Sequence, residues 1–205
     1  MKTSRRSFLK TMLAAGAVIG GPMLMQGSRN IFAAQAGDRN LVVFFSWSGN
    51  TRAIASRIHK KTGGDLMEIQ PVAPYSRDYN TCLDEARRDK EQGRRPELAA
   101  RIDNLARYDT VFLGYPNWWA SIPAPVASLL EAHDFSGKVI VPFCSHGGGR
   151  LGQSVTDIAR LAPHAGIGEA LSIHYSGGSS LDRDIDAWLA KAGIGLWYQP
   201  RNAEK

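Results

Sequence analysis

Between residues 41 and 192, short apolar segments alternate five times with segments of helical spacing. The apolar segments have the length of single strands, and the others carry apolar residues three and four positions apart. The predicted strands are residues 41–45, 65–70, 110–115, 139–143 and 170–175. The predicted helices are residues 51–61, 79–92, 124–132, 152–161 and 181–192. This alternation predicts an α/β fold in which helices cover both faces of a parallel sheet.

Ligands on such a sheet bind beyond the carboxyl ends of the strands. The loops after predicted strands one, three and four have unusual compositions, so we expect a ligand site at these loops. Trp188, by contrast, lies on the apolar stripe of the last helix and is predicted to belong to the core.

The first loop reads SWSGNT and opens a helix. A helix amino terminus presents unpaired N–H groups, and Gly49 lets the backbone approach a ligand closely. The loop lacks the Gly-Lys-Ser/Thr ending of a nucleoside-triphosphate loop and the glycine spacing of a dinucleotide loop. It therefore suits a single monoester phosphate. Alternatively it is a helix cap with incidental serines. The predicted ligand contacts are Ser46, Trp47, Ser48, Gly49, Asn50 and Thr51.

The second loop, GYPNWWASIPAP, places two adjacent tryptophans in a proline-rich segment. Flat, electron-rich side chains at a strand end favour stacking on a planar aromatic ligand. The alternative is that the indoles fill the core beneath the loop, which we expect for at least one of them. The predicted ligand contacts are Pro116, Asn117, Trp118 and Trp119.

The third loop, CSHGGGRLG, contains three consecutive glycines whose N–H groups are free to approach the edge of a ring. His146 and Arg150 are placed to lie near negative charge on that ring, unless both are simply solvated. The predicted contacts are Ser145, His146, Gly147, Gly148 and Gly149.

Residues 1–36 read as a targeting segment. The sequence SRRSFLK precedes an uncharged, moderately apolar stretch that is short for a membrane span, so no stable membrane anchor is expected. The motif resembles the twin-arginine export signal, which implies passage through the twin-arginine translocase to the periplasm. We expect cleavage after Ala36, leaving one domain of residues 37–205. The alternative is an unstructured basic tail.

The net charge of +6 is concentrated in this segment, which holds five basic residues and no acidic residue. The body, residues 37–205, is left with about +1, so no nucleic acid is expected as a partner. Its two cysteines, Cys82 and Cys144, have no metal-site spacing, and whether they pair is left open. No metal site is predicted.

The three loops, in this chain order, resemble those of the flavodoxin family. The matching motifs are S-x-S-G-N-T, G-Y-P-x-W-W and H-G-G, and the likeness covers residues 40–192. It implies a flavodoxin-like three-layer sandwich with strand order 2-1-3-4-5 and bound flavin mononucleotide (FMN). By matching position, the phosphate would lie on Ser46, Ser48, Asn50 and Thr51. The isoalloxazine would lie beside residues 116–119, with its pyrimidine edge on residues 145–149.

The resemblance implies electron transfer through the flavin, with a partner protein or a small acceptor such as a quinone. The family's electron carriers are typically strongly acidic, whereas this body is near neutral, which favours a reductase. No residue is typical of a dedicated general acid or base, so no catalytic residue is predicted, which favours a carrier. A flavin-free binding module is the third alternative.

Overall fold

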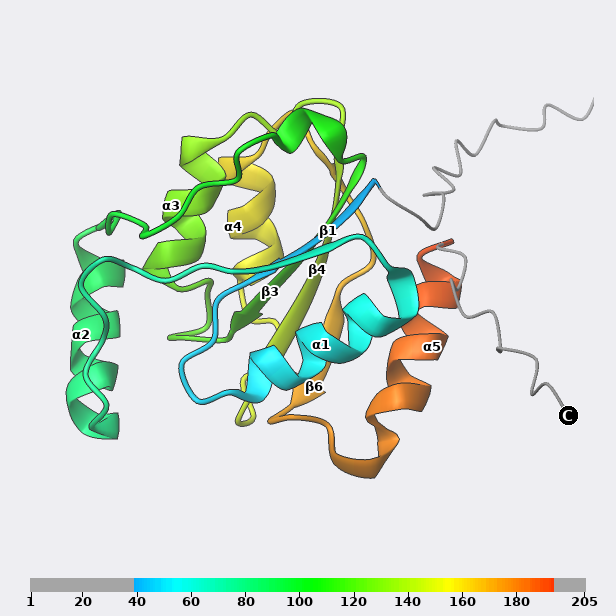
Figure 1. Cartoon of the computed structure of the whole chain (residues 1–205). Coiled ribbons are helices and arrows are strands. Elements are labelled where there is room, and N and C mark those ends of the chain that lie inside the picture. Colours follow the sequence, from blue (N-terminus) through cyan, green and yellow to red (C-terminus); the bar gives the residue numbers. More distant parts are fainter. Residues whose placement is uncertain (1–38, 194–205) are drawn as a thin grey trace, which may run out of the picture. The chain divides into compact units, whose positions relative to one another are not determined.

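The computed structural model describes residues 39–193, which form a parallel sheet between helices (Figure 1). The strands are β1 (Asn40–Phe44), β2 (Asp65–Glu68), β3 (Thr110–Pro116), β4 (Val139–His146), β5 (Gly166–Ile167) and β6 (Leu171–His174). The helices are α1 (Asn50–Thr62), α2 (Tyr79–Glu91), α3 (Ala124–Ala132), α4 (Ser154–Leu161) and α5 (Leu181–Lys191), with short 3₁₀ turns at Leu105–Arg107 and Gly178–Ser180.

The sheet runs β2-β1-β3-β4-β5, and β6 also pairs with β4. All strand pairs are parallel, so the expected α/β fold and strand order 2-1-3-4-5 are confirmed. The fifth position differs from the prediction because two short strands share it. The chain leaves the sheet after Ile167, where β5 ends. Between β5 and β6 the Trp188 indole N–H donates to the Glu169 carbonyl (2.7 Å).

Two other boundaries differ from the predictions for identifiable reasons. β4 continues three residues further than expected, to His146, because its end pairs with β3 on one side and β6 on the other. α4 begins at Ser154 instead of residue 152, since Gly152 has a left-handed backbone (φ 53°). Both differences affect the loop after β4, where a ligand contact is predicted.

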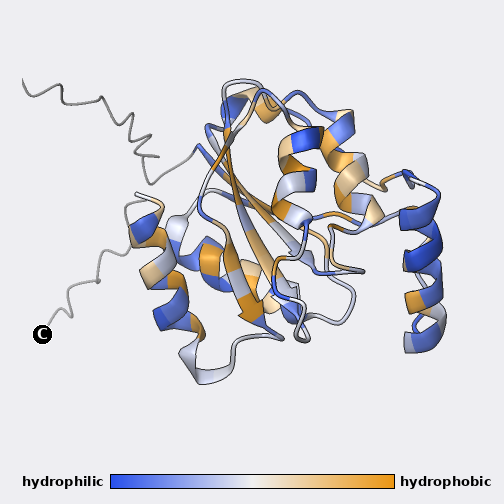
Figure 2. Ribbon diagram, turned by 180° about the vertical axis from the view of Figure 1, so that it is seen from behind, coloured by the Kyte–Doolittle hydropathy of each residue, from blue (hydrophilic) through white to orange (hydrophobic). Residues whose placement is uncertain are grey.

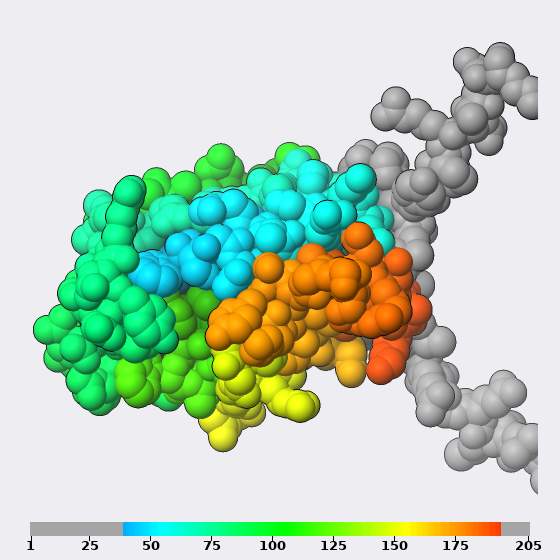
Figure 3. All heavy atoms as spheres, turned by 90° about the horizontal axis from the view of Figure 1, so that it is seen from below, coloured from blue at the N-terminus to red at the C-terminus, as the bar shows by residue number. Residues whose placement is uncertain are grey.

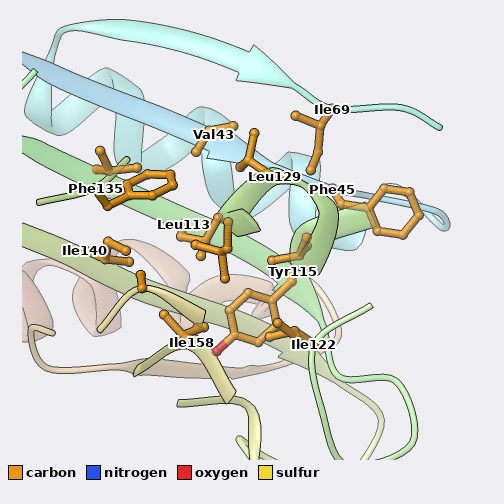
Figure 4. Close-up of a cluster of buried hydrophobic side chains, with 14 of the residues drawn as sticks. Val43, Phe45, Ile69, Leu113, Tyr115, Ile122, Leu129, Phe135, Ile140 and Ile158 are labelled. Carbon is orange, nitrogen blue, oxygen red and sulfur yellow. The ribbon is translucent and has the colours of Figure 1, made fainter. Parts of the chain in front are cut away.

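Each face of the sheet has its own hydrophobic core because alternate residues of a strand point to opposite faces. Val43 and Phe45 lie in the cluster that packs under α3 and α4 (Figure 4). Val42 and Phe44 lie in the cluster under α1 and α5. That second cluster includes Trp188, which is 4% exposed, so its predicted core position is confirmed.

α2 stands apart from the sheet and contacts α3 (Figure 1). Most of its residues are hydrophilic, as the largely blue ribbon of this helix in Figure 2 shows, in agreement with the alternating charges of this segment. Cys82 on this helix and Cys144 in β4 are both buried and free, so the two cysteines do not pair.

The predicted export signal, residues 1–36, lies outside the described residues. Within residues 39–193, no helix is both long and apolar enough to span a lipid bilayer.

Candidate functional site

The loops after β1, β3 and β4 meet at Ser145, near the carboxyl end of β4. The hydroxyls of Ser145 and Thr51 share a hydrogen bond of 2.8 Å, and both residues are buried. The Asn117 N–H donates to the Ser145 carbonyl (2.8 Å). One residue thus fastens the loop after β3 and the start of α1 to the end of β4. The three loops that we selected from the sequence are therefore neighbours in the fold.

The loop after β1 has the backbone of an anion cradle. Gly49 is the N-cap of α1 and has a left-handed conformation (φ 89°), which favours glycine. The first turn of α1 holds no acidic residue, so no carboxylate there competes with an anion for the free N–H groups. Ser48 is exposed, and Gly49 and Asn50 are partly buried.

Ser46 provides a buried donor in this cradle. It is 4% exposed, and its Oγ accepts the Arg52 N–H (3.3 Å). No described residue accepts the proton of the Ser46 hydroxyl, although a buried donor normally has an acceptor. The hydroxyl proton that remains on the Thr51–Ser145 pair is similarly available to a ligand. These donors fit a phosphate monoester.

A hollow of about 430 Å³ adjoins the cradle. Aromatic, polar and proline side chains line it, together with two arginines; they are Phe45, Ser46, Trp47, Ser48, Arg52, Gln70, Pro71, Pro74, Tyr75 and Arg77. The Trp47 indole N–H donates to the Ser76 carbonyl (2.9 Å) and ties the two walls together. The Arg52 guanidinium forms a bidentate ion pair with Glu68 (2.6 and 2.7 Å). The wall formed by residues 70–77 was missed by the sequence analysis.

The two adjacent tryptophans have different surroundings. The Trp118 ring meets Phe45 and Tyr75 edge-on, with centroids 5.4 and 5.0 Å away, and packs against the core under α3. Trp119 is 42% exposed, and its indole N–H donates to the Leu83 carbonyl of α2 (3.1 Å). The Arg87 guanidinium lies 5.7 Å from the centroid of the Trp119 ring. Trp118 thus has the core packing expected for at least one indole, whereas Trp119 binds α2.

Trp119 and Ala120 form a two-residue turn in a strained conformation. Both have positive φ angles, 53° and 60°, and the backbones of Trp118 and Ser121 bond to each other across them. Left-handed backbone at a residue with a side chain costs about 1–2 kcal/mol. The Gln153 N–H donates to the Ala120 carbonyl (2.7 Å) and links this turn to the chain after β4. The turn at Trp119 and Ala120 is thus held by contacts between the loop after β3 and the loop after β4.

The predicted residues 145–149 span the end of β4 and the start of the loop that follows it: Ser145 is buried, His146 is partly buried, and Gly147, Gly148 and Gly149 are exposed. The turn of this loop is held by the Asn117 side-chain amide, which donates to the Arg150 carbonyl (2.5 Å). The Gly148 N–H donates to Nδ1 of His146 (3.0 Å), so this nitrogen carries no proton. Burial, and then the neighbouring His174 and Arg150, lower the pKa of His146 below its ordinary value. The imidazole is therefore neutral at pH 7.

His174 and Tyr175 also border this loop, although the sequence analysis did not select them. The His174 ring lies 5.6 Å from that of His146, and the Tyr175 N–H donates to the His146 carbonyl (2.8 Å). No local motif marks these residues. Only the pairing of β6 with β4 brings them to the site.

Comparisons with known proteins agree with this arrangement. The family model described as flavodoxin matches residues 39–191. A candidate flavoprotein of Bacteroides eggerthii DSM 20697 is 29% identical, with a TM-score of 0.69, covering 78% of this chain and 100% of its own. One of Bacteroides uniformis ATCC 8492 is 26% identical, with a TM-score of 0.63, covering 73% and 99%.

A flavoprotein of Lactobacillus acidophilus NCFM, solved in complex with FMN, is 21% identical. Its TM-score is 0.57, and the match covers 74% of this chain and 99% of that chain. At this identity the likeness concerns the fold. A comparison with curated proteins gave no match.

Proposed function

Because this chain belongs to the flavodoxin family, we propose that it binds FMN and transfers electrons through the bound flavin. One observation carries the proposal: Ser145 joins the phosphate-type loop after β1 to the two loops that the family uses around the flavin ring. The donors of the cradle fit one phosphate, and family membership supports FMN as the cofactor.

Ser46, Ser48 and the amino terminus of α1 would hold the phosphate, together with the pair of Thr51 and Ser145. Residues 116–119 and 145–149 would border the flavin ring. When bound, FMN supplies the one- and two-electron chemistry, which no protein side chain here provides. The protein's contribution is to bind, to orient and to limit the access of water.

Two features of this chain set the environment of the ring. Asn117 fixes the loop after β4 through the Arg150 carbonyl, so the N–H groups of Gly147 and Gly149 have fixed positions. The neutral His146 and the exposed Arg150 place no negative charge beside them. Because neither residue adds negative charge beside the glycine loop, the field there does not repel electrons added to the ring.

The primary proposal is an electron carrier that serves a redox partner protein in the periplasm after export through the twin-arginine translocase. The twin-arginine motif at Arg5 and Arg6 supports this location. The second candidate is an FMN-dependent reductase of a small acceptor such as a quinone. It is favoured by the net charge of about +1 on residues 37–205, since a near-neutral body does not steer basic partners.

The cofactor is tested by purifying residues 37–205 and releasing the bound flavin with acid. We expect one FMN per chain, identified by chromatography, and reconstitution of the yellow protein from apoprotein and FMN. Recovery of mainly flavin adenine dinucleotide, or no flavin after reconstitution, would reject the site.

Carrier and reductase are separated by steady-state oxidation of nicotinamide cofactors with and without added quinone. A reductase turns over with both substrates and no other protein. A carrier shows negligible turnover until a partner reductase is added.

A further inference from the structure

Two histidines lie side by side at the carboxyl edge of the sheet. His146 ends β4 and His174 ends β6, and the two residues are paired in the register of these strands. Their ring centroids are 5.6 Å apart, at an angle of 63°. Figure 3, seen from below Figure 1, shows the orange segment that includes β6 next to the yellow segment after β4. The spacing of the rings is therefore set by the sheet.

Tyr175 contacts both histidines of the pair. Its N–H donates to the His146 carbonyl, and its ring centroid lies 4.3 Å from that of His174. Its backbone is left-handed (φ 50°), a conformation that costs energy in a tyrosine. A Cβ on Gly147 would meet the Tyr175 ring at an ordinary van der Waals distance of 3.5 Å, so this ring lies against Gly147. The two imidazoles are thus fixed relative to the glycine loop.

The charged groups around the pair are unevenly distributed. Arg150, on the loop after β4, contributes a positive charge and helps to lower the pKa of His146. From α5, Asp184 borders the hollow beside His174 and Tyr175, and its carboxylate accepts a hydrogen bond from Ser180 (2.8 Å). Across β4, Asn117 and Ser145 are neutral. Burial, the neighbouring His174 and the Arg150 guanidinium disfavour a positive charge on the His146 ring while the site carries no added electrons.

We propose that His146 and His174 act as one proton-accepting pair, which takes up a proton when electrons enter the bound flavin. The inference rests on the proposed function, since the family places the flavin ring beside the glycine loop. Negative charge added to the ring favours a positive charge on a nearby imidazole, the reverse of the effect of Arg150. The electrons come from an external reductant and the proton from water. Protonation forms one N–H bond on an imidazole and breaks one O–H bond of the hydronium ion that donates the proton, and both changes reverse when the flavin is oxidised again.

The first test measures the protonation of the histidines directly by NMR of their ring C–H groups across pH 5–8. In the apoprotein, His174→Asn should raise the pKa of His146, since one cause of its depression is removed. In the FMN-bound protein, reduction with dithionite should raise the pKa of His146 by about one unit or more. His164→Asn is the control, because His164 is exposed and follows α4 at the opposite edge of the sheet.

The second test follows the two-electron reduction potential of the FMN-bound protein over the same pH range. If one extra proton is taken up with each electron pair, the plot of reduction potential against pH becomes steeper by about 30 mV per pH unit. This is the change in potential that corresponds to a tenfold change in a two-electron equilibrium constant. The double variant His146→Asn, His174→Asn should lose this extra slope, whereas His164→Asn should keep it.

The outcomes are distinguishable. Superimposed slopes for the wild type and the double variant, or a His146 pKa that reduction leaves unchanged, would overturn the inference while the proposed function stands. Failure to bind FMN would reject the proposed function and the inference together.

Discussion

Ser46 is the residue in which burial and chemistry agree most closely. Its side chain is almost fully buried, its oxygen is used by the Arg52 N–H, and its proton remains for a ligand. A capping serine that faces water donates its proton to the solvent, whereas the buried Ser46 hydroxyl has no acceptor for its proton among the described residues. The free proton therefore supports the phosphate assignment more strongly than the motif does.

Ser46→Ala should weaken FMN binding, because it removes one hydrogen bond to a charged oxygen. The expected loss is about 1.5–3 kcal/mol, or about 10- to 150-fold in Kd. Fluorescence titration of the apoprotein measures it. Ser56→Ala is the matched control, since the exposed Ser56 hydroxyl of the same helix bonds only to the Arg52 carbonyl among the described residues. Equal affinities in the two variants would place the phosphate elsewhere.

The two cysteine thiols should be unreactive in the native protein. Burial, followed by the charge of Glu85, raises the pKa of Cys82 to about 11. Burial likewise raises the pKa of Cys144 to about 12. A raised pKa keeps a thiol protonated, so at pH 8 at most about one in a thousand of either is thiolate, the reactive form.

We expect no reaction of native protein with a chromogenic disulfide reagent at pH 8, and two thiols per chain after unfolding in guanidinium. Detection of fewer than two thiols in the unfolded, unreduced chain would contradict the free state of the cysteines. The same shifts make stability highest below the ordinary thiol pKa, and stability falls as the pH rises toward 11.

At the scale of elements, α2 depends on contacts with the turn after β3. The Trp119 indole N–H bonds to the Leu83 carbonyl, and the Lys90 ammonium donates to the Trp119 carbonyl. α2 buries only Cys82, Ala86 and Asp89, so apolar packing contributes little to its position. The bond to Trp119 is thus one of the polar contacts that hold this helix, beside the Tyr75 hydroxyl bond to Asp89 and the Ser76 N–H bond to Glu85.

Trp119→Ala should therefore loosen α2 selectively. Amides of α2 should exchange with deuterium about 10-fold faster, which corresponds to about 1.4 kcal/mol of lost local stability. Amides of α1 serve as the internal control, since that helix packs on the sheet through Ile54 and Ile58. Lys60→Ala, on the polar face of α1, is the control substitution. Equal acceleration in both helices would indicate global destabilisation instead of a lost tether.

At the scale of the whole molecule, the positive charge is separated from the body. Five basic residues without an acidic one precede a nearly neutral domain, an arrangement that suits an export segment.

Arg5→Lys with Arg6→Lys keeps this charge and removes only the twin-arginine pair. We expect the precursor to accumulate in the cytoplasm, folded and yellow, as fractionation and flavin absorbance would show. The matched control is Arg29→Lys in the same segment, which should export normally. A normal periplasmic yield of the Lys-Lys variant would exclude the twin-arginine route.

Much of the fold follows from local sequence patterns. Apolar segments such as residues 110–115 predict buried strands, and the helix at Ala124–Ala132 has the predicted bounds because its spacing and flanking prolines are local signals. The phosphate-type loop is similarly local, since a strand, a short polar turn with Gly49 and a helix follow one another in the chain. The parallel alternation then places all three ligand loops at one edge of the sheet.

Tertiary structure decided the features that depend on distant segments. Whether an indole faces a ligand or the core depends on what packs beside it, and here Tyr75 meets Trp118 while Leu83 binds Trp119. The wall at residues 70–77 arises because that segment folds back beside the loop after β1. His174 joins His146 only because β6 pairs with β4, an interaction between residues 28 positions apart in the sequence. Local periodicity specifies the elements and their faces, whereas these contacts depend on how the assembled sheet brings separate loops together.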